Sequence, residues 1–222
     1  LSYFLFYYHA QNGAKAMLPD TSVKIGTVCA WFFDGPGEDA ALIFYPGAKV
    51  EAAAYAPLLV QIAESGVDCF LVEMPLHVAF LGINAADRII EDHAYKNWVL
   101  AGHSLGGVAA SSYAASHRDS VAGLVLLASY PTVELRGLPV LSIYGDRDEV
   151  LNRDSYEKSR VLWPDGAEEL VISGGNHAQF GGYGPQRGDG EAAITPEEQQ
   201  TQTVEAVSDW MHRHILEGTE AA

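Results

Sequence analysis

Short runs of apolar residues alternate along the chain with segments in which apolar positions recur at helical spacing. The short runs are rich in β-branched and aromatic residues and end at Gly, Pro or Asp, which is typical of strands. The pattern predicts strands at Ser22–Thr27, Cys29–Phe33, Ala41–Tyr45, Val67–Val72, Trp98–Ala101, Ala122–Ala128, Pro139–Tyr144 and Glu169–Ile172. It predicts helices at Glu51–Ser65, Asn84–His93, Leu105–His117, Asn152–Trp163 and from Thr195 to Gly218.

The order of these elements predicts the fold class. Apolar runs that are each followed by a helix indicate parallel strands buried on both faces. We therefore expect an α/β protein with a doubly wound, mostly parallel sheet of about eight strands flanked by helices, opened by two antiparallel segments. Residues 22–218 fit a single domain of ordinary size. In the last helix, Thr195-Pro196-Glu197-Glu198 predicts a capping box, and Val204, Val207, Met211 and Ile215 form the apolar stripe.

Residues 1–21 form an N-terminal segment before this domain and begin with LSYFLFYY. This apolar run is far shorter than the roughly 20 residues that span a bilayer. It is either the stub of an upstream membrane anchor or signal segment, or a helical turn packed on the body. No other window reaches a membrane-spanning length, so we expect a soluble domain, tethered to a membrane or extracytoplasmic only through such an upstream segment.

Composition narrows the function classes. Hydrophobic residues make up 48% and charged residues 19% of the chain, which excludes disorder as its main state. The net charge of −16 argues against nucleic acid and anionic membrane surfaces as partners. Cys29 and Cys69 lie in apolar runs, where buried free thiols are expected rather than a disulfide or a reactive thiol. The sequence has no H-E-x-x-H or C-x-x-C spacing, so we expect neither metal nor cofactor.

The strongest chemical motif is G-x-S-x-G at Gly102-His103-Ser104-Leu105-Gly106, placed between a predicted strand and a predicted helix. In this context the motif is a nucleophile elbow, whose glycines let strand and helix approach each other and whose serine projects from a strained turn. Because a serine hydroxyl is a weak nucleophile at neutral pH, Ser104 needs a base and a group that orients that base.

Chain order selects the partners, since the acid and then the histidine follow the serine in such a site. His177 comes directly after a strand and is the expected base, whereas His212 and His214 lie in the terminal helix and are expected at the surface. The acid belongs in the run Tyr144-Gly145-Asp146-Arg147-Asp148-Glu149-Val150. We favour Asp148, one turn past the strand end and followed by an apolar anchor, with Asp146 as the main competitor and Glu149 as a third candidate.

Two backbone N–H groups are needed for the oxyanion that forms during acyl transfer. We expect one from Leu105, the residue after the nucleophile, and the other from the loop Pro46-Gly47-Ala48-Lys49. In that loop Ala48 is the favoured donor and Lys49 the alternative.

At these residues the sequence resembles the α/β-hydrolase superfamily. The runs IFYPGAKVEAAAYAPL, GHSLGG, SIYGDRDEV and GGNHAQFGGYGP resemble a bacterial group of small cap-less hydrolases related to dienelactone-hydrolase-like and esterase-like domains. The resemblance implies Asp148 as the acid, through a Gly-x-x-Asp pattern after the strand, and a frequent upstream hydrophobic anchor. Dienelactone hydrolases use a cysteine nucleophile, so Ser104 argues against dienelactone chemistry, and the YPGA loop argues against lipase-like specificity.

The same resemblance suggests where substrate binds. Cap domains of this fold are inserted where this chain has only the short gap Ser129–Leu138, so we expect an open site. The loop Met74–Ile83 either lines an acyl pocket or packs in the core, and the loop of residues 179–194 either forms a rim over the site or fills the surface. The candidate pocket residues are Lys49, Leu76, Val78, Phe80, Tyr130, Phe180 and Tyr183.

We therefore expect a serine carboxylesterase-type hydrolase that cleaves a small-molecule ester. Ser104, His177 and Asp148 would act as a catalytic triad, with an oxyanion hole formed by Ala48 and Leu105. The alternatives are a thioesterase or acyltransferase that uses the same triad, and a non-catalytic binding module on this fold.

Overall fold

The computed structural model describes residues 6–25 and 28–217. Its centre is an eight-stranded sheet in the order β1-β2-β4-β3-β5-β6-β7-β8. Strand β2 runs antiparallel to both of its neighbours, and every other pairing is parallel. This confirms the predicted sheet. The strands are β1 Ser22–Ile25, β2 Val28–Phe33, β3 Ala40–Tyr45, β4 Asp68–Val72, β5 Asn97–His103, β6 Gly123–Leu127, β7 Val140–Gly145 and β8 Glu168–Ile172.

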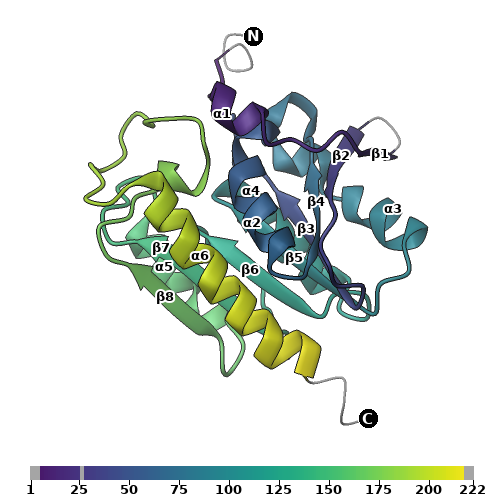
Figure 1. The fold of residues 1–222 in the computed structure, drawn as a ribbon. Coiled ribbons are helices and arrows are strands. Elements are labelled where there is room, and N and C mark those ends of the chain that lie inside the picture. Colours follow the sequence, from purple (N-terminus) through teal and green to yellow (C-terminus); the bar gives the residue numbers. More distant parts are fainter. Residues whose placement is uncertain (1–5, 26–27, 218–222) are drawn as a thin grey trace.

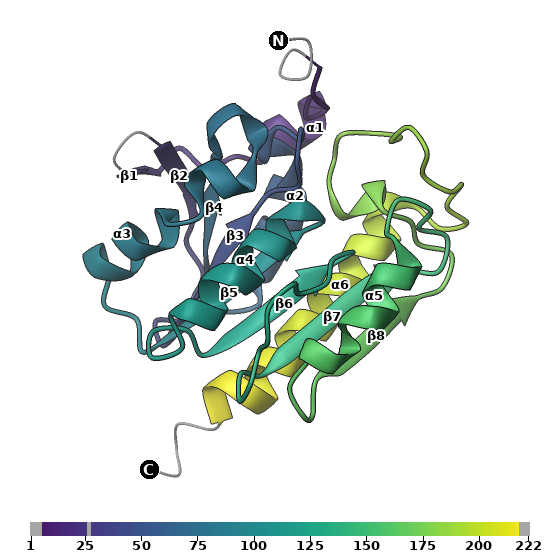
Figure 2. The same ribbon diagram turned by 180° about the vertical axis from the view of Figure 1, so that it is seen from behind.

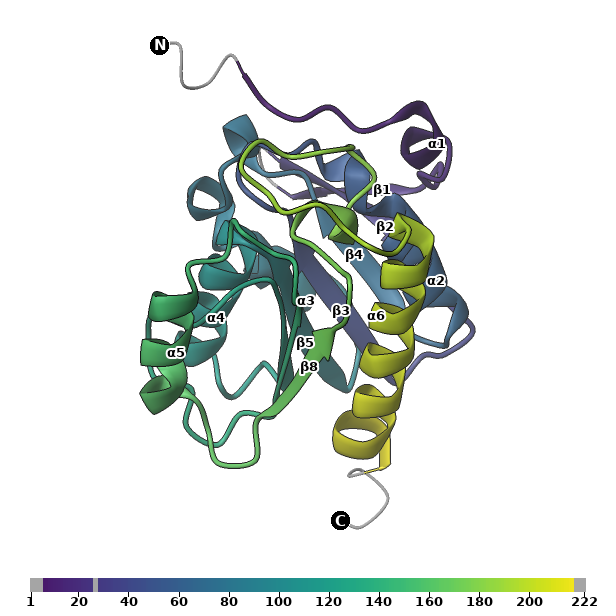
Figure 3. The same ribbon diagram turned by 90° about the vertical axis from the view of Figure 1, so that its left-hand side faces the viewer.

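Helices cover both faces of the sheet (Figures 1 and 2). They are α1 Asn12–Lys15, α2 Ala56–Glu64, α3 Ala85–Asp92, α4 Leu105–Ser116, α5 Arg153–Ser159 and α6 Pro196–Met211. Figure 3 shows α2 and α6 on one side of the sheet, with α4 and α5 on the other. Two apolar clusters fill the spaces between the layers, one under α2 and α6 and one under α3 and α4.

Burial explains why the central strands are continuous apolar runs. Every residue of β3, β4, β6 and β7 is buried, as expected for parallel strands covered on both faces. The edge strand β8 alternates between exposed and less exposed positions. Side chains at the carboxyl ends of the central strands therefore meet at one edge of the sheet, where sites of doubly wound folds lie.

Two predicted helices differ in detail from the structure. The segment expected at Glu51–Ser65 begins as the 3₁₀ turn Ala52–Tyr55 and becomes α-helical at Ala56. Helix α6 has the predicted capping box between Thr195 and Glu198 and continues into a π-helical turn, His212–Leu216. Gly218, the predicted end of that helix, lies outside the described residues, as do Gly26 and Thr27 between the first two strands.

The described part of the N-terminal segment is attached to the body. The Tyr8 N–H donates to Lys49 O at 2.6 Å, and the Glu51 N–H donates to Tyr8 O at 2.9 Å, which forms a parallel bridge beside the loop after β3. Residues 1–5 lie outside the described residues, so the upstream anchor stays a hypothesis. Within residues 6–25 and 28–217, no helix is both long and apolar enough to cross a bilayer.

The two cysteines are free thiols in different environments. Cys69 is buried in β4, where burial raises the pKa of its thiol well above the usual value. Cys29 is only half-buried in β2, so the expectation of two buried thiols holds for Cys69 alone.

Candidate active site

Ser104 lies between β5 and α4 in a strained backbone conformation, with φ 53° and ψ −124°. A non-glycine residue with positive φ of this kind is costly and persists only where its surroundings hold it. Here the Ser104 N–H donates to Leu127 O at 2.9 Å, and the Ser129 hydroxyl donates to Ser104 O at 2.7 Å. The end of β6 and the residues after it therefore fix the backbone of the elbow, while the Ser104 hydroxyl does not cap α4.

The glycines of the motif are required by close backbone approach. A Cβ atom at Gly102 would lie 2.5 Å from the carbonyl carbon of Gly106. A Cβ atom at Gly106 would lie 2.1 Å from Tyr45 O and 2.4 Å from Pro46 O. The first turn of α4 is thus pressed against both β5 and the loop after β3, which brings the two candidate oxyanion segments together.

Replacing Gly106 with alanine is expected to displace either α4 or the loop after β3. Overpacking of this kind costs about 1–3 kcal/mol of unfolding free energy, and the displacement should also lower kcat for any reaction at Ser104. Urea denaturation and an activity assay measure the two effects. Gly13→Ala is the control, because no atom lies within 4 Å of the added Cβ. Equal stability of the two variants would contradict the steric role of Gly106.

His177 and Asp148 form a buried pair at the carboxyl ends of β8 and β7. His177 Nδ1 lies 2.8 Å from Asp148 Oδ2, and the two side chains are 2% and 0% exposed. The other oxygen, Asp148 Oδ1, accepts the N–H groups of Val150 at 2.9 Å and Leu151 at 2.7 Å. A carboxylate held in this way accepts a hydrogen bond from the Nδ1–H group of the imidazole, which leaves Nε2 as the basic nitrogen.

The structure separates the competing acids and histidines. Asp146 is exposed and its Oδ1 accepts the Gly174 N–H at 2.7 Å, which ties β7 to the turn after β8. Glu149 is exposed as well. Of the three acids, Asp148 is the one hydrogen-bonded to His177. His212 and His214 are exposed and pair with Glu217 and Glu168 at the other end of α6.

Two residues that hold the His177 turn were missed by the sequence reasoning. The Asp189 carboxylate accepts the N–H groups of His177 at 3.3 Å and Ala178 at 2.8 Å. The Gln199 side chain accepts the Asn176 N–H at 2.9 Å and donates to Asn176 O at 2.8 Å. A sequence signal existed for Gln199, since it shares the buried face of α6 with Val207.

The backbone N–H groups of the loop after β3 differ in whether they already have a hydrogen-bond acceptor. The Gly47 N–H donates to the Tyr55 hydroxyl at 3.1 Å, and the Lys49 N–H donates to His77 O at 2.8 Å. Among the described residues, neither the Ala48 N–H nor the Leu105 N–H has a hydrogen-bond acceptor. This pattern favours Ala48 over Lys49 as the loop's donor to a bound oxyanion.

The expected pocket residues lie in different surroundings. Leu76 and Phe80 are 61% and 45% exposed, so their role in lining an open acyl pocket stays a prediction. Tyr130 packs against the small cluster of Tyr144, Leu151 and Tyr156.

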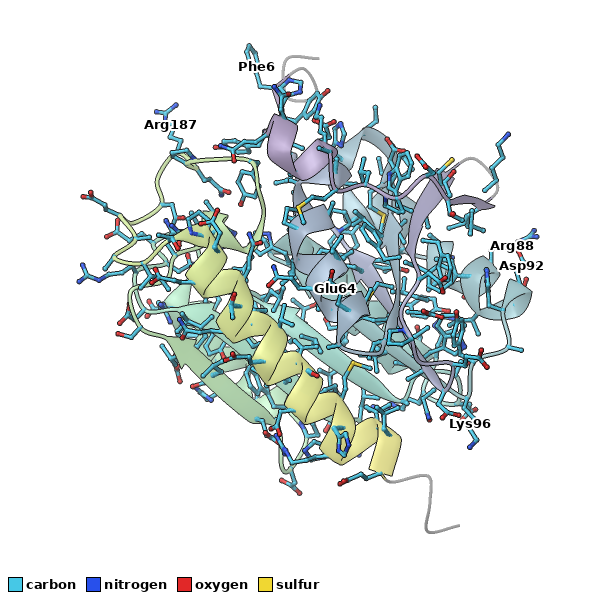
Figure 4. All side chains as sticks on the ribbon, viewed as in Figure 1. Phe6, Glu64, Arg88, Asp92, Lys96 and Arg187 are labelled. Carbon is cyan, nitrogen blue, oxygen red and sulfur yellow. The ribbon has the colours of Figure 1, made fainter. Side chains whose placement is uncertain are left out.

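The two aromatic residues of the loop after His177 are less exposed than a rim over the site would suggest, and the rim role of the loop stays a prediction. Phe180 and Tyr183 are buried, and the Phe180 ring lies 5.6 Å from that of His103. The Tyr183 ring lies 5.5 Å from that of Tyr8, so both aromatic side chains contact other rings and neither forms an exposed edge. Arg187, further along this loop, points outward (Figure 4).

A cavity of about 800 Å³ lies on another side of the His177 turn. Its walls come from α1, α2, the start of α6 and the loop of residues 181–192, and they include Asn176, Ala178 and Gln179. Ser104, Asp148 and His177 do not line it, so this cavity is separate from the candidate active site. In the described ranges, no group of three or more His, Cys, Asp or Glu side chains is arranged to hold a metal ion.

Comparisons with known proteins agree with this architecture. A model of the alpha/beta hydrolase family matches residues 41–201. Est1E from Butyrivibrio proteoclasticus is 15% identical, with a TM-score of 0.65 over 88% of this chain and 98% of Est1E. A thermophilic esterase from Thermogutta terrifontis is 13% identical, with a TM-score of 0.62 over 90% of this chain and 95% of the esterase.

A dienelactone hydrolase from Anabaena variabilis is 16% identical, with a TM-score of 0.61 over 89% of this chain and 97% of that enzyme. At such identities the solved structures establish a shared fold. No curated protein sequence gives a significant match.

Proposed function

Because the chain belongs to the alpha/beta hydrolase family, we propose that it cleaves carboxylic esters through an acyl-enzyme, with Ser104 as nucleophile, His177 as base and Asp148 as orienting acid. The observation that carries this proposal is the buried His177–Asp148 pair at the sheet edge where Ser104 occupies its strained turn. Structural neighbours that are named as esterases support the same class of reaction.

The proposed reaction has two halves. Ser104 Oγ attacks the ester carbonyl while His177 Nε2 takes its proton, and the ionised Asp148 stabilises the imidazolium that forms. The tetrahedral intermediate collapses, His177 gives the proton to the leaving alcohol, and the acyl group stays on Ser104. Water then attacks the acyl-enzyme with His177 again as base, which releases the carboxylic acid and regenerates the Ser104 hydroxyl.

Negative charge develops on the carbonyl oxygen in the tetrahedral intermediate, and the protein must stabilise this charge to lower the reaction barrier. The Ala48 and Leu105 N–H groups are proposed to donate to this oxygen in the tetrahedral intermediate. Both are amides without an acceptor in the described structure, so no internal hydrogen bond must break before they act. Leu105 is also the first residue of α4, whose N-terminal dipole favours negative charge.

The test is hydrolysis of p-nitrophenyl esters from acetyl to palmitoyl by the purified chain. The expected result is turnover with an optimum acyl length, together with an acyl or phosphonyl adduct on Ser104 detected by intact-protein mass after ester or fluorophosphonate treatment. Faster product formation and an alkyl ester product on addition of an alcohol would favour the acyltransferase alternative. A folded protein that neither turns over esters nor reacts with a fluorophosphonate would overturn the proposal.

A further inference from the structure

One buried hydroxyl joins the two segments that carry the proposed oxyanion donors. The Tyr55 hydroxyl accepts the Gly47 N–H at 3.1 Å and lies 2.7 Å from His103 Nδ1. Gly47 immediately precedes Ala48, while His103 immediately precedes Ser104 and Leu105. From the sequence, His103 is expected to pack beside Ser104 and not to act in catalysis, and Tyr55 has no expected role.

This connection lies where the sheet no longer holds the two segments together. The parallel ladder between β3 and β5 ends at the pair Tyr45 and Gly102. Beyond that pair, the loop after β3 and the elbow depend on other contacts for their spacing. The Tyr55 hydroxyl supplies one, from the turn that opens the next helix.

The proton positions follow from burial and from the available acceptors. Burial lowers the pKa of His103 well below its usual value, so the ring is neutral. In the described structure His103 Nδ1 is the only acceptor for the Tyr55 hydroxyl proton. The chain of hydrogen bonds therefore runs from the Gly47 N–H to Tyr55 Oη, and from the Tyr55 O–H to His103 Nδ1.

The rest of the His103 ring faces the turn that carries the proposed base. Its Nε2 is buried without a well-aligned hydrogen bond among the described residues, and the His177 backbone is a polar neighbour of the ring. The centroids of the His103 and His177 rings are 4.5 Å apart. Burying a polar ring here costs more than an apolar side chain would, which indicates a function for His103. The packing is also tight, because a Cβ atom at Gly47 would lie 2.9 Å from both His103 Nδ1 and the Tyr55 hydroxyl.

We propose that Tyr55 and His103 are positioning residues that set the spacing between the Ala48 and Leu105 N–H groups. The inference rests on the proposed function, since it gives these two side chains a role in the same oxyanion hole. Neither side chain is proposed to make or break a bond, although the His103 ring also packs beside that of His177, with 4.5 Å between centroids. They act through the segments that they join, by keeping both amides aimed at one oxygen.

The decisive variant is Tyr55→Phe, which removes the hydroxyl and keeps the ring. Loss of one oxyanion donor typically lowers kcat by about 10²–10³-fold, and a donor that is displaced but present should cost less. We expect kcat for p-nitrophenyl esters to fall by roughly 10–100-fold with KM changed less than about threefold, because ground-state binding does not use the oxyanion geometry.

Tyr156→Phe is the matched control for a general loss of stability. Tyr156 is also fully buried, and its hydroxyl lies 2.9 Å from that of Ser142 and donates to Glu169 at 2.7 Å, away from the elbow. Both variants should have a lower Tm, but kcat should fall only in Tyr55→Phe. At position 103, His103→Asn keeps an acceptor near the place of Nδ1 and should retain more activity than His103→Leu.

A second readout depends on the oxyanion itself. Sulfur is a larger and weaker hydrogen-bond acceptor than oxygen, so a well-formed oxyanion hole favours an oxoester over the matching thionoester. Tyr55→Phe should reduce this preference, and Tyr156→Phe should not.

Equal kcat and equal oxoester preference in Tyr55→Phe and Tyr156→Phe would overturn the positioning role while leaving the hydrolase proposal intact. If the wild-type chain neither hydrolyses esters nor reacts with a fluorophosphonate, the proposed reaction itself is wrong. The oxyanion role of both residues is then wrong as well.

Discussion

Alanine in place of Ser104 is expected to lower kcat for p-nitrophenyl esters by roughly 10³–10⁶-fold, since a triad nucleophile cannot be replaced by its neighbours. The change removes the oxygen that would form the acyl-enzyme. It leaves the amide of residue 104 bonded to Leu127 O and the carbonyl bonded to the Ser129 hydroxyl, so the elbow keeps its supports. Steady-state kinetics, with the adduct mass as a second readout, measures the loss.

Ser112→Ala is the control for this variant, because Ser112 lies on α4, directly after the elbow, and among the described residues its hydroxyl bonds only to Val108 O. Its kcat should stay near that of the wild-type chain. Undiminished turnover in Ser104→Ala would mean that another group is the nucleophile, or that a contaminating esterase produces the signal.

Asn in place of Asp148 is expected to lower kcat by about 10⁴-fold with little change in the fold. The Asn oxygen can still accept the Val150 and Leu151 N–H groups, which directs its NH₂ group toward His177 Nδ1. An NH₂ group there requires Nδ1 to be the acceptor, so the proton moves to Nε2 and the base is blocked. Kinetics on the same ester series tests this expectation.

Asp146→Asn separates the two acids that the sequence left in competition. Asp146 is exposed and bonds to the turn after β8 rather than to His177. Its replacement should therefore leave kcat within about a few-fold of wild type, as expected for a surface substitution. The reverse order of effects, with Asp146→Asn the more damaging variant, would reassign the acid.

The sheet was predictable because its central strands are buried on both faces. Each of them therefore appears in the sequence as a continuous run of apolar residues. The ends of the strands were harder to predict where a residue type disfavours strands but pairing with neighbouring strands holds that residue in one. Strand β5 was expected to end at Ala101, but Gly102 and His103 continue the ladder opposite Leu126 and Leu127. Glycine disfavours strands on its own, so pairing extends this one: Gly102 pairs with both β3 and β6, and His103 pairs with β6.

The elbow and the histidine were predictable because each directly follows a strand. The groups that hold them in place were not, because they come from distant parts of the chain. Asp189 reaches back from the Gly-rich loop, Gln199 from α6, and Tyr55 from the turn before α2. Leu76 and His77 adopt left-handed conformations that neither residue type favours, so the shape of their loop has no local signal.

The attachment of the N-terminal segment has a practical consequence for immobilising this protein. Tyr8 is bridged to Val50 beside the loop that carries Ala48, whereas the end of α6 lies at the opposite edge of the sheet (Figure 1). Coupling to a solid support near the start of the chain would turn the strand ends that carry the site toward the support and strain that bridge. Coupling beyond α6 would leave those strand ends facing the solution.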